Sequence, residues 1–317
     1  MSSSPELQPD LAFSAQQAQP LLEAWFGGPV RCTGIERLRG GMVNTVLRLD
    51  FDRPPNRAVV KLHTGAGSSF QAEARGLRYL RAETACPVPQ VYLVDTESRL
   101  IPYAFLLMEH LPGQVLDGVD LEPAAQADLE IQLADLLGGL HEHTGRRWGR
   151  IDDANGAASW ADLFLARLGS ARAHPLVDER LEPAALAALD VAIAAAPALL
   201  ADAGTPTLVH GDVWAGNLLV EREGERWRIS GLLDPDVQFA DVEYELAYLE
   251  VFDASRATFF EAYLRHHRLR PGYQQRRQVY WLYTALVHVA LFGDEFFCEF
   301  TTRTAASIAQ LVRAGRV

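Results

Sequence analysis

Apolar positions in the first third of the chain occur in short runs with strand spacing, interrupted by one stretch with helical spacing. The strand-like runs at residues 58–62 and 103–108 are bounded by polar residues, glycine and proline. In residues 69–82 the apolar side chains recur every three to four positions, as on one face of a helix. The pattern predicts strands and one helix over roughly residues 35–108, after a first helix at residues 15–26.

From Asp120 onward the pattern becomes mainly helical. Asp120 is expected to cap a helix whose leucine stripe ends near Gly145. The alanine-rich stretch at residues 191–201 predicts a helix kinked by Pro197, and residues 274–292, apolar on nearly every side, predict a buried helix. The chain is therefore expected to have an α+β fold with two lobes: a smaller one with a mixed antiparallel sheet, and a larger, mainly helical one.

A polar hairpin interrupts the helical part. Residues 218–220 and 227–233 have strand patterns, and the polar stretch 221–226 between them predicts a turn. An antiparallel hairpin brings its start and its end together, so Asn217 and Asp234, which flank the two strands, are expected to lie opposite each other. Amide and carboxylate oxygens suit Mg²⁺, which also binds phosphate oxygens and water.

Three residues near this hairpin have the spacing of a kinase catalytic loop. His210, Asp212 and Asn217 form the pattern His-x-Asp-x-x-x-x-Asn. A lone aspartate at this place would be interpreted as a turn residue. Because Asp212, Asn217 and Asp234 occur together, we expect phosphoryl transfer, with Asp212 aligning the attacking hydroxyl and the other two holding Mg²⁺.

A lysine and a glutamate upstream predict a nucleotide-phosphate site. Lys61 lies in an apolar strand, and Glu73 lies on the apolar stripe of the next helix. Buried charges need partners, so we pair these residues and direct Lys61 to the nucleotide phosphates. The alternative is a lysine that reaches solvent and a solvated glutamate. Gly40, Gly41 and Asn44 precede this strand and form either a phosphate-binding turn or a plain one.

The second of the apolar strands ends at a Pro-Gly break, which fits a hinge between two lobes at residues 1–112 and 113–317. Backbone groups of Glu109 and Leu111 are then candidates for pairing with the edge of adenine. An ordinary strand-to-helix connection is the alternative, because backbone contacts leave no side-chain pattern.

Charge and cysteine content narrow the classes of partner. A net charge of −12 over 317 residues argues against a nucleic-acid or anionic-membrane partner, and no apolar stretch reaches spanning length. The three scattered cysteines form no disulfide framework, and the first ten residues lack a secretory pattern. These features predict the cytoplasm and leave the oligomeric state open.

Several stretches resemble the fructosamine kinase family, within the aminoglycoside- and choline-type phosphotransferases of protein-kinase-like fold. The likeness runs from about Gly40 to about Phe297, with the catalytic stretch 210–217 and residues 280–293 among its markers. It implies ATP-dependent phosphorylation of the 3-hydroxyl of a ketoamine, the sugar adduct of an amine. The acceptor would be a small molecule or a glycated amine, and we expect Trp214 to stack on it.

Two other functions remain open at this point. Only a short stretch separates Asp234 from the next expected helix at residues 241–252, so the long activation segment of protein kinases is absent and small acceptors are favoured. An aminoglycoside or other alcohol kinase of the same superfamily would share every catalytic residue, and the acidic chain would suit a polycation. The second alternative is a nucleotide-binding protein without catalysis.

Overall fold

The computed structural model of the protein describes residues 11–38, 44–64, 69–153 and 155–316. Contacts divide the chain into two compact units. The first unit contains the described residues up to Ala125 together with Ala215–Asp236, and the second contains Gln126–Trp214 and the residues from Val237 onward. By its contacts, the hairpin that was expected in the C-terminal lobe therefore belongs to the N-terminal unit. The lobe boundary at residue 112 stays a prediction.

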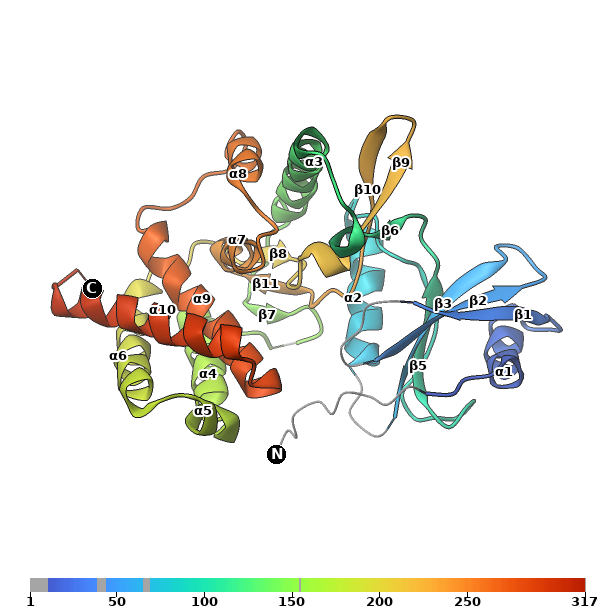
Figure 1. Ribbon diagram of the computed structural model, residues 1–317, viewed down its shortest axis with the longest axis horizontal. Coiled ribbons are helices and arrows are strands. Elements are labelled where there is room, and N and C mark those ends of the chain that lie inside the picture. The colour runs from blue at the N-terminus through green and yellow to red at the C-terminus, as the bar shows by residue number, and fades with distance from the viewer. Residues whose placement is uncertain (1–10, 39–43, 65–68, 154, 317) are drawn as a thin grey trace. The chain divides into compact units, whose positions relative to one another are not determined.

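The first unit is built on a five-stranded antiparallel sheet with the order β1-β2-β3-β5-β4 (Figure 1). Its strands are β1 (Cys32–Arg37), β2 (Thr45–Phe51), β3 (Arg57–His63), β4 (Val91–Asp95) and β5 (Ala104–Glu109), and its helices are α1 (Ala15–Phe26) and α2 (Phe70–Glu83). The strands and helices expected in this part of the chain are confirmed. Helix α1 begins with a capping box formed by Ser14 and Gln17 and ends at Gly27, whose φ of +62° suits glycine.

The central strand β3 is covered on both faces. Val60 and Leu62 share a core with Leu21 and Leu22 of α1. Side chains alternate along a strand, so Lys61 points to the opposite face, where it contacts Glu73 of α2. This burial on both sides explains why the apolar run in β3 is nearly continuous.

A second, three-stranded sheet in the first unit has the order β10-β9-β6. Its elements are β6 (Gln114–Val115), β9 (Leu218–Glu223) and β10 (Arg226–Leu232), with the 3-10 turns η1 (Leu116–Gly118) and η2 (Ala215–Asn217) beside them. The expected hairpin is confirmed, but its turn is shorter than the predicted stretch 221–226. Pairing continues to Glu223 and Arg226, because Gly224, with φ of +66°, supports a two-residue turn.

The second unit is mainly helical, as expected, and carries a small sheet of order β7-β11-β8. Its elements are most of α3 (Pro123–His141), then β7 (Gly149–Arg150), α4 (Trp160–Arg172), α5 (Pro175–Arg180), α6 (Pro183–Leu199), β8 (Thr207–Val209), β11 (Gln238–Ala240), α7 (Val242–Val251), α8 (Ala257–Tyr263), α9 (Tyr273–Phe292) and α10 (Glu295–Arg313). None of the helices in the described part of the chain combines the length and apolar content needed to cross a bilayer.

The predicted bounds of α3 were wrong at both ends. The helix begins at Pro123, so Asp120 lies outside it and does not cap it. It ends at His141 because residues 143–145 form backbone hydrogen bonds with residues 206–208, in and just before β8. The carbonyl of His143 accepts from the Leu208 N–H at 2.8 Å, and the Gly145 N–H donates to Pro206 at 2.8 Å.

Helix α9 is the central helix of the second unit and contacts α4, α5, α6, α7 and α10 (Figure 1). The buried helix expected at residues 274–292 is therefore confirmed. Tyr280 of α9 links two other elements, because its hydroxyl accepts from Trp160 Nε1 at 3.1 Å and donates to Asp241 at 2.6 Å. Asp241 caps α7 through its side chain.

Candidate active site

Lys61 lies between two carboxylates in the first unit. Its Nζ is 2.7 Å from Glu73 Oε1 and 2.8 Å from Asp234 Oδ1. The predicted pair of Lys61 and Glu73 is confirmed as a contact, and each residue is only 5% exposed, so neither reaches solvent as the alternative required. We call Lys61, Glu73 and Asp234 the lysine cluster. Lys61 is also the only lysine in the sequence.

The lysine cluster contains one ammonium and two carboxylates, so its positive and negative groups are unequal in number. Burial alone would lower the pKa of Lys61, but the carboxylates of Asp234 and Glu73 outweigh burial and raise it. For Glu73, burial is the largest influence and raises the pKa to about 7, with Lys61 opposing the shift and Asp234 adding to it. One ammonium faces two carboxylates, so Lys61 stays charged while the buried Glu73 binds a proton more readily than an exposed glutamate.

Asn217 and Asp234 lie across the base of the hairpin, as the sequence predicted. Leu218 pairs with Leu232, and the N–H of Leu233 donates to the carbonyl of Asn217 at 2.9 Å. Asn217 is buried, whereas the side chain of Asp234 is 45% exposed. Asp234 has φ of +57°, a left-handed conformation that aspartate tolerates better than most residues.

The donor set at the hairpin base fits Mg²⁺ bound together with a nucleotide. In the parts of the chain that the structure describes, no group of three or more His, Cys, Asp or Glu side chains could hold a metal by itself. One carboxylate and one amide oxygen are hard ligands but leave most of an octahedron to phosphate oxygens and water, as is usual for Mg²⁺. Asp234 already contacts Lys61, so these ligands lie beside the cation predicted to bind phosphates.

The expected phosphate turn and hinge are only partly visible. Gly40 and Gly41 lie outside the described residues, and Asn44 Oδ1 lies 3.1 Å from Nδ1 of His63. The Glu109 N–H donates to the carbonyl of Gln90 at 2.8 Å, so an adenine contact at Glu109 would have to use its carbonyl. The half-buried side chain of Leu111 packs on Gly231, where a Cβ would lie 2.7 Å from Leu111 Cδ1.

In the second unit, the loop that carries Asp212, the predicted catalytic loop, is attached to α7 through hydrogen bonds. The Gly211 N–H donates to Glu245 Oε1 at 2.6 Å, and Glu245 Oε2 lies 2.7 Å from His141 Nε2. His141 Nδ1 lies 2.8 Å from the hydroxyl of Tyr263. We call Gly211, Glu245, His141 and Tyr263 the α7 network. It links the catalytic loop to helices α3, α7 and α8.

Asp212 is contacted from two sides within the same unit. Its backbone N–H donates to Nδ1 of His210 at 3.3 Å, and the hydroxyl of Tyr248, on α7, donates to Asp212 Oδ1. The sequence reasoning missed both Tyr248 and Glu245. The available signal for Glu245 was the presence of acidic residues in α7, a helix that is otherwise apolar on nearly every side.

The first turn of α7 is held by two further buried carboxylates. Asp241 accepts from Arg270 at 2.6 Å and from Tyr280 at 2.6 Å. Glu243 accepts from Arg276 at 2.7 Å and from Arg270 at 2.9 Å. Because each of these buried charges has a partner, the start of the helix that carries Glu245 and Tyr248 is fixed.

Trp214 begins a series of aromatic contacts in the second unit. Its ring centroid is 6.2 Å from that of Phe252, which lies 4.7 Å from Tyr248 and 5.3 Å from His288. His288 stacks on Phe297 at 4.2 Å. It is therefore a packed histidine, as predicted, and burial lowers its pKa. We call these five residues the aromatic row; an acceptor contact by Trp214 stays a prediction.

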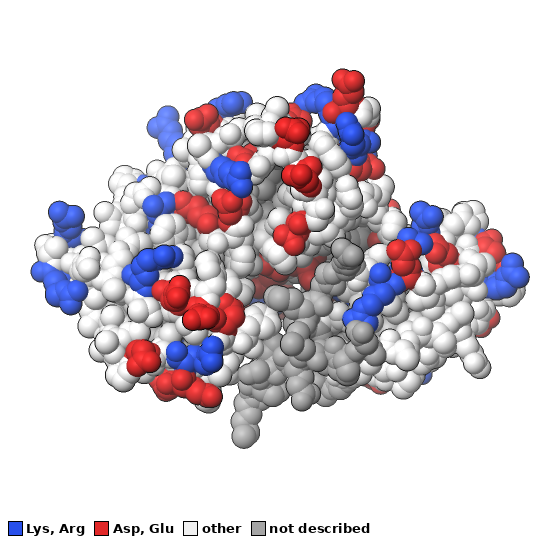
Figure 2. Space-filling model, viewed as in Figure 1, with Lys and Arg blue, Asp and Glu red and all other residues white. Residues whose placement is uncertain are grey.

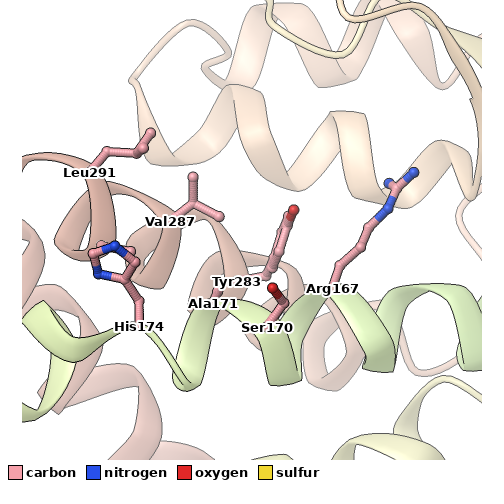
Figure 3. Close-up of a pocket in the computed structure, with 8 residues that line it drawn as sticks. Arg167, Ser170, Ala171, His174, Tyr283, Val287 and Leu291 are labelled. Carbon is pink, nitrogen blue, oxygen red and sulfur yellow. The ribbon is translucent and has the colours of Figure 1, made fainter. Parts of the chain in front are cut away.

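A shallow hollow of about 270 Å³ lies between α4 and α9 (Figure 3). Figure 3 shows Arg167 on one side of it and His174 on the other. Arg167 already donates to Gln238 at 2.6 Å and lies over the ring of Trp160. The hollow is lined by Arg167, Ser170, Ala171, His174, Tyr283, Val287, Ala290 and Leu291. It contains none of the predicted catalytic residues.

Charged side chains are spread over the face drawn in Figure 2. Acidic and basic groups are interspersed there, although the acidic ones exceed the basic ones by 12 in the whole sequence. No single sign of charge dominates this face. The charged side chains with a clear structural role are buried ones, in the lysine cluster and at the start of α7.

Comparison with known proteins agrees with this geometry. A probable ketoamine kinase from Synechocystis sp. is 32% identical over 243 residues, which cover 72% of this chain and 74% of that protein. A candidate fructosamine-3-kinase from Haemophilus somnus 129PT has a TM-score of 0.70 at 19% identity, over 92% of this chain and 97% of its own.

A thermostable mutant of aminoglycoside phosphotransferase APH(4)-Ia, solved with ADP and hygromycin B, has a TM-score of 0.64 at 17% identity, over 93% of this chain and 98% of its own. At such identities these structures establish the fold, so the expected kinase-like fold is confirmed. The family model described as fructosamine kinase matches residues 14–312. The chain thus belongs to the fructosamine kinase family.

Proposed function

We propose that the protein is an ATP-dependent kinase that uses Mg²⁺ and phosphorylates a sugar hydroxyl of a ketoamine. The lysine cluster carries this proposal: Lys61 contacts both Glu73 and Asp234 within 2.8 Å in a member of the fructosamine kinase family. This is the contact pattern that a kinase uses to hold phosphates next to a metal ligand. The name of the Synechocystis relative supports a ketoamine as acceptor.

On the nucleotide side, the proposal gives each predicted residue one role. The Lys61 ammonium, oriented by Glu73, binds phosphate oxygens, and the backbone at Gly40, Gly41 and Asn44 covers them. Asn217 and Asp234 would hold Mg²⁺, which neutralises charge on the phosphates when it is bound. The Glu109 carbonyl and the Leu111 backbone are proposed to meet the edge of adenine.

On the acceptor side, Asp212 receives the proton of the attacking hydroxyl. The sugar oxygen forms a bond to the γ-phosphorus as the bond from phosphorus to the leaving oxygen breaks, so the products are a sugar phosphate and ADP. Trp214 is proposed to stack on the sugar. Positioning and charge neutralisation supply most of the rate enhancement. The ring of Trp214 lies 6.2 Å from that of Phe252, between centroids.

The test is an acceptor panel with purified protein and Mg²⁺–ATP. Fructosyl-lysine, ribulosyl-lysine, an aminoglycoside, choline and homoserine are compared by ADP formation, and the phosphorylated position is read by ³¹P and ¹³C NMR. We expect transfer to a ketoamine hydroxyl. Transfer to the aminoglycoside alone would replace the proposal by antibiotic phosphorylation. Thermal stabilisation by ATP without transfer to any acceptor would indicate a non-catalytic nucleotide-binding protein.

We also propose that the protein works in the cytoplasm on a small molecule or a glycated amine. None of the three cysteines forms a disulfide in the described part of the chain, and this supports a reducing compartment. The excess of acidic residues supports a partner other than nucleic acid or an anionic membrane.

A further inference from the structure

Tyr248 is the residue of α7 whose side chain contacts the catalytic carboxylate. Its hydroxyl donates to Asp212 Oδ1, and its ring packs on Phe252 with centroids 4.7 Å apart. Tyr248 lies one helical turn beyond Glu245, which binds the N–H of Gly211. The same helix therefore contacts two consecutive residues of the catalytic loop, one through its backbone and one through its carboxylate.

We infer that Tyr248 is a positioning residue for phosphoryl transfer, which fixes one oxygen of Asp212 and thereby orients the carboxylate toward the acceptor hydroxyl. The inference rests on the proposed function, in which Asp212 receives the hydroxyl proton. Tyr248 itself exchanges no proton in the step, because the hydroxyl proton goes to Asp212 and the phosphoryl group goes to the acceptor oxygen.

The surroundings of Tyr248 allow it to act only as a donor to Asp212. Burial, followed by the charge of Asp212, raises the pKa of the phenol, so it keeps its proton over the working range. The other titratable groups that act on this phenol are Tyr244 and Glu245, both on α7, and His210 of the loop accepts from the Asp212 N–H. The nearest ring on its other side is Phe252, which is apolar.

Two consequences follow for Asp212. A carboxylate held by one oxygen has fewer orientations, so less ordering remains when the acceptor binds. A hydrogen bond donated to a carboxylate also favours its charged form, which is the form able to accept a proton. Loss of the Tyr248 hydroxyl should therefore slow the chemical step and shift its pH dependence, without affecting the nucleotide.

The test is Tyr248→Phe, which removes the hydroxyl and keeps the ring. We expect kcat to fall about tenfold to a hundredfold, because a hydrogen bond to a charged group is lost. The KM for ATP should be unchanged, and the acidic limb of the kcat–pH profile should move to higher pH. Tyr273→Phe is the matched control, since Tyr273 donates at 2.9 Å to Glu250, another carboxylate of α7. It should leave that limb in place.

A second measurement does not depend on the acceptor. The titration of the Asp212 carboxylate is followed by ¹³C NMR and assigned by its loss in Asp212→Asn. We expect its midpoint to rise in Tyr248→Phe and to stay unchanged in Tyr273→Phe. An unchanged midpoint together with an unchanged acidic limb would overturn the inference. If the wild type transfers phosphate to no acceptor, the proposed function fails, and the midpoint alone decides whether Tyr248 controls Asp212.

Discussion

The lysine cluster and the α7 network differ in how completely their charged side chains are paired. In the lysine cluster, one ammonium faces two carboxylates, and Asp234 remains 45% exposed. In the α7 network, Glu245 is fully buried and both of its oxygens have partners. The first arrangement has excess negative charge that a bound cation would relieve. The second is already satisfied and serves to hold the catalytic loop.

This difference suggests that the lysine cluster serves to bind a ligand and the α7 network serves to fix the geometry of a reacting group. Where a ligand is to bind, an unbalanced charge in the free protein favours binding, because a ligand of the opposite charge then neutralises it. Contacts that set the geometry of a reacting group are best made complete in the free protein, so that no reorganisation is needed during the reaction. Substitutions in the two regions should therefore affect different measured quantities.

The largest effect is expected for Asp212→Asn. The amide cannot accept the hydroxyl proton, so kcat should fall by about 10²–10⁴. ATP binding, measured by calorimetry, should stay close to that of the wild type, because Asp212 is assigned to the acceptor. Turnover equal to the wild type would remove Asp212 from the mechanism.

Next in size is Lys61→Met, which deletes the cation of the lysine cluster. We expect kcat/KM for ATP to fall by about tenfold to a hundredfold, because the phosphates lose their ammonium and face two carboxylates. The KM for the ketoamine should change little, and initial rates with each substrate varied separately would show this. An effect confined to the ketoamine KM would contradict the nucleotide role of Lys61.

A smaller effect, on stability, is expected for Glu245→Ala. This change leaves the Gly211 N–H and His141 without their acceptor, at a cost of about 1–3 kcal/mol for each buried group left unpaired. Glu245→Gln keeps one acceptor oxygen and should recover part of the loss. Chemical denaturation of both variants measures the two values. Equal stability of the wild type and Glu245→Ala would show that the network does not support the loop.

The smallest effect concerns pH. The pKa of Glu73 is raised from 4.5 to about 7, so the folded protein binds more protons than the unfolded chain between these values. The free energy of unfolding should therefore decrease as pH rises through this window and level off above it. Denaturation without nucleotide or Mg²⁺ should show this slope in the wild type and a weaker one in Glu73→Gln. An identical slope in both proteins would assign it to other groups.

Much of the lysine cluster could be predicted from sequence because its parts are local. Lys61 and Glu73 are 12 residues apart in the sequence, and each is a charged residue within an apolar pattern. The hairpin likewise placed Asn217 opposite Asp234. The contact between Asp234 and Lys61 could not be predicted, since it depends on how the hairpin meets the sheet.

The α7 network was beyond prediction for a similar reason. Glu245 and His141 are separated by 104 residues, so no local pattern in the sequence pairs them. Tyr248 resembles any core tyrosine in the sequence. The wrong start of α3 arose because Asp120 has cap chemistry but the chain turns into the helix only at Pro123. Cap chemistry at one residue therefore does not fix where a helix begins.

The burial of Lys61 has a consequence for the protein as a chemical target. Sugars form ketoamines by condensing with primary amines. Apart from Lys61, every residue counted as Lys or Arg in this sequence is arginine, whose guanidinium is not a primary amine of that kind. The single side-chain amine is 5% exposed and engaged by two carboxylates. A protein proposed to act on glycated amines thus offers reducing sugars almost no lysine surface of its own.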